Sequence, residues 1–131
     1  MTGKVKAVLD ASAILALLQQ EPGAEKLTDD VLERAVAGAV NMAEVESGLV
    51  AKGLDPDEAW EDAISTVDAL EPFTGEQAKI AGSLVKKTAP LGLSLGDRSC
   101  LALAISLKAE VYTTERSWKN LKLGLRVHVM R

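Results

Sequence analysis

The sequence predicts an α/β fold with three layers, α/β/α, around a mostly parallel central sheet. Short apolar segments alternate with longer helical patterns along the whole chain, and this order is typical of a parallel sheet with helices on both faces. The chain has 131 residues, 47% of them hydrophobic, so it is long enough to bury one substantial core. We therefore expect residues 1–131 to form a single domain.

The first half of the chain combines one clear strand with three helical segments. In chain order, the expected elements are a strand over 5–9, a helix from about 12 to 21, a helix over 24–35, a short apolar segment over 37–40 and a helix over 42–52. Pro22-Gly23 ends the first helix and Gly53 ends the last. Asn41 is a good N-cap residue, so it is expected to open the helix over 42–52.

The second half has strong signals for where its helices begin. Its expected elements are a helix from 55 to about 70, a strand over 71–73, helices over 74–88 and 95–108, and strands over 111–113 and 126–130. Asp55-Pro56 is a cap followed by proline at the first helical position, and Ser94 caps the apolar helix over 95–108. Pro90 and Gly92 break the pattern between these helices.

Four acidic residues occupy the same kind of position in four separate parts of the chain. Each follows a predicted strand or lies in the first turn of the next helix, and they are Asp10, Glu44, Asp97 and Glu115. Ligands of open parallel sheets bind outside the carboxyl ends of the strands, so these carboxylates are expected to converge there. Carboxylates held together repel one another without a cation. A site of oxygens alone suits Mg²⁺ or Mn²⁺.

Helix capping is the alternative interpretation of the same acids. Asp10 could cap the helix that follows it. Glu44 stands three residues after Asn41, and Asp97 three residues after Ser94, which is the spacing of a capping box in both cases. Capping does not exclude function, because a helix N-terminus also attracts anionic ligands.

Composition excludes several classes of protein. Cys100 is the only cysteine, so the chain has no intramolecular disulfide and no cysteine-based zinc site, and a reducing cytoplasm is the expected setting. Few aromatic residues are present to stack on bases. Lys4 and Lys6 precede the apolar run over 7–18 as in a signal peptide, but Asp10 inside that run argues against export. No segment reaches the length of a membrane span.

The charges are unevenly distributed, although the formal net charge is −4. Residues 55–76 contain acids and no lysine or arginine. After Glu115 the chain carries only basic charges, at Arg116, Lys119, Lys122, Arg126 and Arg131. A solvated acidic helix face and a basic tail explain this pattern. Beside a carboxylate cluster, however, a basic strip is also where a phosphate backbone would be held.

Four segments, in order along the chain, resemble the motifs of a known family. They are residues 8–13 (VLDASA), 41–45 (NMAEV), 93–104 (LSLGDRSCLALA) and 111–118 (VYTTERSW). They are similar to the successive motifs of PIN-domain ribonucleases, in particular the VapC-type toxins of bacterial toxin–antitoxin pairs. The third segment is the most specific, and the resemblance spans the whole chain.

The resemblance implies roles for individual residues. Asp10, Glu44 and Asp97 would be the catalytic acids that bind Mg²⁺ or Mn²⁺. The polar residues expected to line the site are Ser12, Asn41 and Thr113, and those expected to contact RNA phosphates are Arg98, Arg116 and Lys119. Glu115 would be the fourth catalytic acid, where the family usually has aspartate. Its longer side chain puts a role at a second metal in question.

The resemblance also implies an activity and partners. The expected protein is a cytoplasmic, metal-dependent endoribonuclease that acts on structured RNA such as transfer RNA, forms homodimers and binds a cognate antitoxin. A non-catalytic interaction module, whose acids are only helix caps, is the alternative. A response-regulator receiver fits poorly, because Asp10 has no acidic neighbour and the strand before Thr74 does not end in aspartate.

Overall fold

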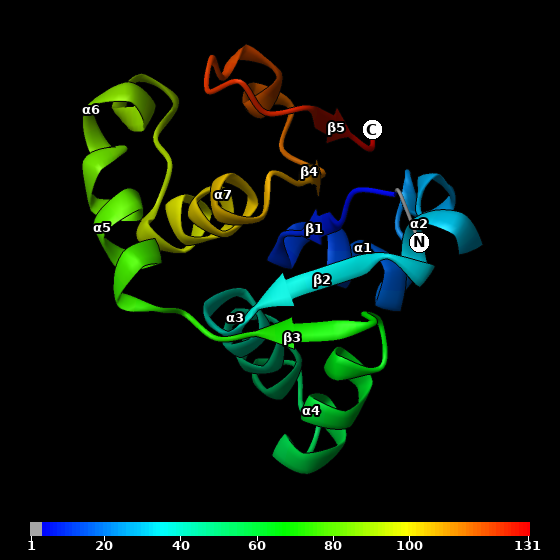
Figure 1. Ribbon diagram of the computed structural model, residues 1–131. Helices are drawn as coiled ribbons and strands as arrows, with labels where there is room; N and C mark the ends of the chain where they lie inside the picture. Colours follow the sequence, from blue (N-terminus) through cyan, green and yellow to red (C-terminus); the bar gives the residue numbers. More distant parts are fainter. Residues whose placement is uncertain (1–3) are drawn as a thin grey trace.

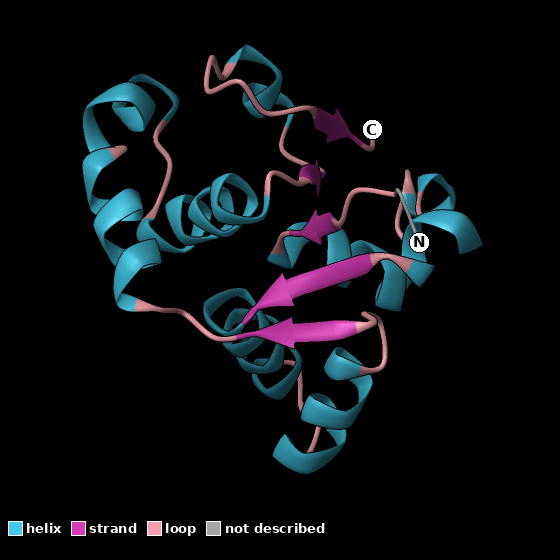
Figure 2. Ribbon diagram, viewed as in Figure 1, coloured by secondary structure: helices cyan, strands magenta, loops and turns pink. Residues whose placement is uncertain are grey.

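Five parallel strands form one sheet at the centre of the protein (Figures 1 and 2). The structure is a computed structural model that describes residues 4–131. Its strands are β1 (Ala7–Leu9), β2 (Ala35–Gly38), β3 (Ala69–Glu71), β4 (Glu110–Thr113) and β5 (Val127–Val129). Their order in the sheet is β3-β2-β1-β4-β5, and every pair is parallel. The first strand of the chain therefore lies in the middle of the sheet.

Helices cover both faces of this sheet, as the sequence predicts. They are α1 (Ala11–Gln19), α2 (Asp29–Glu33), α3 (Ala39–Ala51), α4 (Pro56–Ile64), α5 (Gly75–Ser83), α6 (Val85–Thr88) and α7 (Leu95–Leu107), with short 3₁₀ turns at η1 (Ala24–Lys26), η2 (Ala89–Leu91) and η3 (Arg116–Asn120). Helices α1, α3 and α4 lie on one side of the sheet, and α5, α6 and α7 lie on the other (Figure 1). The three-layer α/β/α prediction is confirmed.

The alternation of side chains along the strands divides the core into two clusters. Ala7 and Leu9 of β1 pack with α1, α3 and α4, whereas Val8 packs with α7 and Trp118. Successive residues of a strand point to opposite faces, so each central strand contributes to both clusters. This burial on both faces fixes the register of β1, and with it the position of Asp10 at its end.

Two boundaries in the first half differ from the sequence prediction. The single helix expected over 24–35 is wrong: η1 and the short α2 occupy this region, and Ala35 begins β2. Alanine favours a helix, but here Ala35 pairs with Ala7 in the sheet and is completely buried. Tertiary packing has overridden local preference.

The start of α3 corrects the role predicted for Asn41. The helix begins at Ala39 with Gly38 as its N-cap residue, so Asn41 is the third helical residue and not the cap. Its side chain is buried and donates to Glu44 and to the carbonyl of Gly96. Glu44 and Asn41 therefore do not form a capping box, despite their spacing.

In the second half, α4 and β3 differ from expectation. Helix α4 ends at Ile64 instead of continuing to about 70, and β3 begins at Ala69 instead of Glu71. The helix expected over 74–88 is divided into α5 and α6, with Leu84 between them. The predicted N-caps Asp55 and Ser94 are confirmed, because their side chains accept hydrogen bonds from backbone amides of the first helical turn.

Within residues 4–131, no helix is both long and apolar enough to cross a membrane.

Candidate active site

Parallel topology brings the predicted site segments to one edge of the sheet. Strand β1 ends at Leu9, immediately before Asp10, and its neighbours β2 and β4 end at Gly38 and Thr113. Helix α7 precedes β4, so its first residues return to this same edge. The site therefore lies where the carboxyl ends of the three central strands meet the start of α7.

Asp10 is the buried centre of this edge. Its side chain is only 3% exposed, and it accepts hydrogen bonds from three donors. The Ser12 hydroxyl donates to Oδ1 at 2.7 Å, the Ala13 amide donates to Oδ1 at 2.8 Å, and the Thr113 hydroxyl donates to Oδ2 at 2.6 Å. The Ala13 bond caps α1, so Asp10 is a helix cap as well as a candidate ligand.

The two hydroxyl groups are themselves held by the backbone of the segment after β4. The Thr114 amide donates to Ser12 Oγ at 3.0 Å, and the Glu115 amide donates to Thr113 Oγ1 at 3.1 Å. Each hydroxyl has one proton, and both protons are committed to Asp10. The two hydroxyl oxygens, Ser12 Oγ and Thr113 Oγ1, lie 3.3 Å apart. Both hydroxyls donate to the carboxylate of Asp10. The predicted lining residues Ser12 and Thr113 are both found beside Asp10.

Burial raises the pKa of Asp10 from 3.8 to about 6, because the charged carboxylate is deprived of water. The three hydrogen bonds, from Thr113, Ser12 and Ala13, lower the pKa but do not offset burial. The negative charge of Asp97 raises the pKa further. A nearby cation would offset this effect.

Glu44 lies on the rim of the site, one turn into α3. Its side chain is exposed, and Oε1 accepts a hydrogen bond of 2.8 Å from Asn41 Nδ2. The same Nδ2 donates to the Gly96 carbonyl at 3.1 Å, so Asn41 links the starts of α3 and α7. Among the described residues, Asn41 Oδ1 is one of two buried side-chain atoms without a hydrogen-bond partner.

Asp97 lies in the first turn of α7 and forms the capping box that its spacing predicts. The Ser94 amide donates to Asp97 Oδ2 at 2.9 Å, and the Asp97 amide donates to Ser94 Oγ at 3.1 Å. Its side chain is half-buried. Asp97 therefore has a structural role, and its charge also reaches Asp10.

Cys100 is buried near the start of α7. The thiol is completely buried one turn after Asp97, and its pKa is raised first by burial and then by the charges of Asp10, Asp97 and Glu44. All three charges therefore disfavour the ionised thiol. The prediction that Cys100 belongs to the core is confirmed, and the thiol itself is unsuited to nucleophilic chemistry.

The remaining predicted residues lie further from this centre. Glu115 is exposed, and its backbone rather than its side chain contacts Thr113. Arg98 donates to the Ala81 carbonyl at 2.9 Å and thereby ties α7 to α5. Arg116 donates to the Arg131 carbonyl at 3.3 Å, and Lys119 is exposed on η3.

The donor set fits a hard divalent cation, since Asp10, Glu44 and Asp97 offer only carboxylate oxygens. Within residues 4–131, however, no three histidine, cysteine, aspartate or glutamate side chains stand close enough together to hold a metal ion. The side chain of Asp97 is turned to the Ser94 amide, and that of Glu44 to Asn41. The three residues therefore offer the oxygen ligands that a divalent cation prefers, but hydrogen bonds hold their carboxylates apart.

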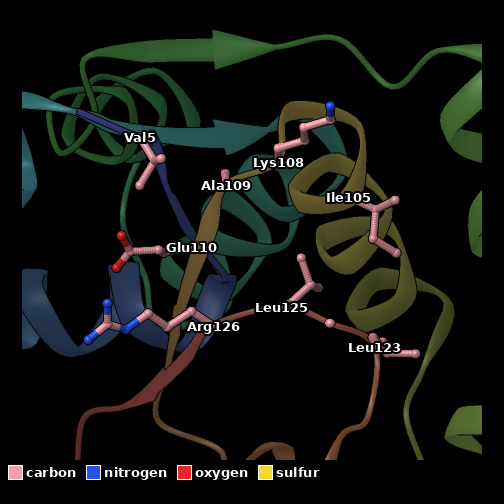
Figure 3. A pocket seen from close by; sticks show the side chains of 9 residues that line it. Val5, Ile105, Lys108, Ala109, Glu110, Leu123, Leu125 and Arg126 are labelled. Carbon is pink, nitrogen blue, oxygen red and sulfur yellow. The ribbon is translucent and has the colours of Figure 1, made fainter. Parts of the chain in front are cut away.

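A second concave region lies at the opposite end of the strands (Figure 3). Its volume is about 350 Å³, and its lining includes Lys108, Glu110 and Arg126, which flank or begin β4 and β5. In a parallel sheet this is the amino-terminal edge, so the pocket is separate from the carboxylates. This pocket is thus not where the acids gather.

Gly96 is a site residue that the sequence prediction missed. It is buried beside Glu44, and its carbonyl accepts from Asn41. A glycine within the first turn of an otherwise apolar helix was the available signal, because isolated glycine in a helix usually has a packing reason.

Comparison with known proteins shows the family and supports the fold. Residues 7–122 match the sequence pattern of the PIN domain. The fold is similar to a toxin–antitoxin complex from Klebsiella pneumoniae (TM-score 0.75, 18% identity, covering 96% of this chain and 98% of that one). It is also similar to DNA-bound VapBC from Salmonella typhimurium (TM-score 0.74, 20% identity, 95% and 98%).

A third similar structure is a sarcin–ricin-loop-cleaving VapC toxin from Mycobacterium tuberculosis (TM-score 0.70, 14% identity, covering 89% of this chain and 97% of that one). At these identities the likeness concerns the fold. No curated protein matches the chain significantly.

Proposed function

Because this chain belongs to the PIN-domain family, we propose that it is a metal-dependent endoribonuclease of the VapC toxin type. The observation that carries the proposal is the buried Asp10, which accepts three hydrogen bonds and faces the charge of Asp97 at the carboxyl edge of the sheet. Protein interiors avoid such an arrangement unless it serves a ligand or a reaction.

Asp10, Glu44 and Asp97 are the residues that would hold Mg²⁺ or Mn²⁺. When bound, such an ion activates water and neutralises the charge that develops on the scissile phosphate. The carboxylates of Glu44 and Asp97 are turned to Asn41 and to the Ser94 amide, respectively. Glu44 and Asp97 are each held by a single hydrogen bond and at least partly exposed, so both are free to reorient.

The protein's own contribution is to orient Asp10. The hydroxyls of Ser12 and Thr113 donate to opposite oxygens of the carboxylate, which fixes its plane. Both hydroxyls favour the ionised form that binds metal, because they donate to it. Removing the Thr113 hydroxyl would leave the carboxylate held at Oδ1 only, whereas loss of the Ser12 hydroxyl would leave the Ala13 amide at Oδ1 and Thr113 at Oδ2.

RNA is the proposed substrate, and structured RNA such as transfer RNA is the proposed class. Arg116 and Lys119 are exposed on η3, which begins directly after Glu115, so positive charge lies next to the acidic edge. Phosphate contacts of this kind hold a backbone without reading sequence. A similar fold cleaves the sarcin–ricin loop, a structured RNA, which supports this class.

The test is cleavage of RNA by the purified protein with and without divalent metal. We expect cleavage with Mg²⁺ or Mn²⁺, loss of cleavage in chelator, and no cleavage by Asp10→Asn, with Asp68→Asn as a charge-matched control distant from the site. RNA cleavage that persists after exhaustive chelation would contradict metal dependence. Failure of the wild-type protein to cleave any structured RNA, with either metal present, would overturn the proposed function.

A cognate antitoxin and a second copy of the chain are the proposed protein partners, in the cytoplasm. Large apolar side chains remain exposed at Phe73, Val85 and Leu95, around the α5–α7 end of the molecule. Exposed apolar groups of this size favour association. Light scattering should show a dimer, and coexpression with the neighbouring gene should yield a complex; a strict monomer without a copurifying protein contradicts this proposal.

A non-catalytic interaction module remains the alternative, and the capping box of Asp97 is the observation that favours it. Helix caps stabilise the folded protein, whereas repelling ligands destabilise it without metal. The two functions therefore predict opposite changes in stability when Asp10 loses its charge.

A further inference from the structure

Gly96 lies directly against the carboxylate of Glu44 in its present position. A Cβ atom built on Gly96 would overlap Glu44 Oε2 and stand 2.8 Å from both Cδ and Oε1. Carbon and oxygen atoms in van der Waals contact are farther apart than this. Any side chain at position 96 would therefore push the Glu44 carboxylate out of its present place.

Backbone conformation does not explain this glycine. Positive φ angles occur at Gly23, Gly53, Gly92 and Gly124, whereas Gly96 lies within the regular helix α7. Alanine is the better residue for helix formation, by about 1 kcal/mol over glycine. The chain thus keeps a residue that weakens α7, at the one position where it faces Glu44.

The Gly96 carbonyl also orients the residue that holds Glu44. Asn41 Nδ2 has two hydrogens, and they are donated to the Gly96 carbonyl and to Glu44 Oε1. The reversed amide would set Asn41 Oδ1 against a carbonyl oxygen and a carboxylate, so this orientation is the favourable one. Asn41 is thereby fixed by α7 and in turn fixes a carboxylate of α3.

We propose that Gly96 is a positioning residue of the metal site, which sets the place of Glu44 by leaving room for its carboxylate and by anchoring Asn41. The proposal rests on the proposed function, since Glu44 would be a metal ligand. Gly96 touches neither metal nor RNA, and it acts only through Glu44. One position of α7 thus determines how a carboxylate on α3 approaches Asp97, the next residue along α7.

The first test compares Gly96→Ala with the matched control Gly82→Ala. Gly82 is also helical, in α5, and a Cβ there meets nothing within 4 Å. We expect Gly96→Ala to fold and to bind Mn²⁺ about tenfold more weakly by calorimetry, because loss of an outer residue that orients a ligand typically costs about 10–100-fold. Gly82→Ala should leave Mn²⁺ binding unchanged. Wild-type affinity in Gly96→Ala overturns the proposal.

The second test places Gly96→Ala in a Glu44→Ala background, where the obstructed carboxylate is absent. There the added methyl group should have no further effect on Mn²⁺ affinity, and it should raise the melting temperature of the metal-free protein as Gly82→Ala does. With Glu44 present, the gain in melting temperature should be smaller or reversed. Equal effects in both backgrounds, on binding and on melting, would show that Gly96 does not act through Glu44.

The two tests separate this proposal from the proposed function. If the wild-type protein neither binds Mn²⁺ nor cleaves RNA, the nuclease function fails. The melting temperatures of the four metal-free proteins would then still show whether Gly96 and Glu44 are coupled. Coupling in melting without Mn²⁺ binding would confine Gly96 to a structural role and overturn its assignment to a metal site.

Discussion

The two sides of the acidic site are built differently. Asp10 is buried at the end of a central strand and accepts three hydrogen bonds, whereas Glu44 and Asp97 lie on helices, the first exposed and the second partly buried, with one side-chain bond each. Asp10 is fixed by β1, the start of α1 and the end of β4. The other two carboxylates depend on local contacts with Asn41 and Ser94, so their geometry can change without disturbing the core.

The largest effect is expected from Asp10→Asn. This change should abolish RNA cleavage and stabilise the metal-free protein at pH 7, because it removes a buried charge whose pKa is raised to about 6. A shift of that size corresponds to up to about 3 kcal/mol in the free energy of unfolding. Thermal melting in chelator should show the higher stability.

The pH dependence of melting gives the control. The folded protein holds the Asp10 proton more tightly than the unfolded chain does, so this contribution is present below pH 3.8 and is lost as the pH rises through about 6. The difference in stability between Asp10→Asn and wild type should therefore grow over that range. A mutant that is less stable at pH 7 would identify Asp10 as a cap alone.

Thr113→Val tests whether the hydroxyl groups set the properties of Asp10. The change removes the donor to Asp10 Oδ2, and since that bond lowers the pKa of Asp10, the pKa should rise further. An unpaired buried acceptor costs about 1–3 kcal/mol in stability. The acid limb of the cleavage profile should move to higher pH; Thr114→Val, which contributes only its backbone amide, should leave it in place.

At the start of α7, variants of Ser94 and Asp97 should distinguish an effect on stability from an effect on cleavage. Ser94→Ala removes the acceptor for the Asp97 amide and should lower stability by about 1 kcal/mol while cleavage is retained, because the Ser94 amide still holds Asp97. Asp97→Asn should abolish cleavage with little change in melting, since its amide oxygen can accept the same bond. If the two variants lose activity and stability in parallel, Asp97 acts as a cap.

The smallest effect is expected at Glu115, whose side chain is exposed. If it completes the site, Glu115→Asp should weaken Mg²⁺-supported cleavage more than Mn²⁺-supported cleavage, because Mg²⁺ demands near-ideal geometry, and Glu115→Gln should impair both. Equal cleavage by all three proteins with either metal would make Glu115 an ordinary turn residue.

The sequence is sufficient to predict the surroundings of the buried Asp10, but it predicts those of the more exposed Glu44 less well. Apolar runs fixed β1 and β4, and Asp10, Ser12 and Thr113 follow from their positions at the strand ends. Helix and strand periodicity coincide in short runs of alanine and valine, so the start of β2 was missed. Asn41 was misplaced as a result.

The contact between α3 and α7 could not be predicted from the spacing of residues within either helix. The spacing of Asn41 and Glu44 is the same as that of Ser94 and Asp97, yet only the second pair is a capping box. What distinguishes them is where each helix begins: Ser94 is the N-cap residue of α7, whereas α3 begins at Ala39 and Asn41 lies inside it. The Asn41 side chain also donates to the carbonyl of Gly96, a residue 55 positions away. Such a contact depends on how α3 packs against α7, which a single sequence does not state.

The central position of β1 has a consequence for the time at which activity can arise. The Asp10–Thr113 hydrogen bond joins residues 103 positions apart, because β1, the first strand to be synthesised, lies beside β4, the fourth. At a synthesis rate of about 5–20 residues per second, Asp10 leaves the ribosome about 5–20 s before its partner. Until β4 emerges, β1 has an open edge and no floor for a site. We therefore expect ribosome-bound chains that stop before Glu110 to be digested readily by protease and to cleave no RNA.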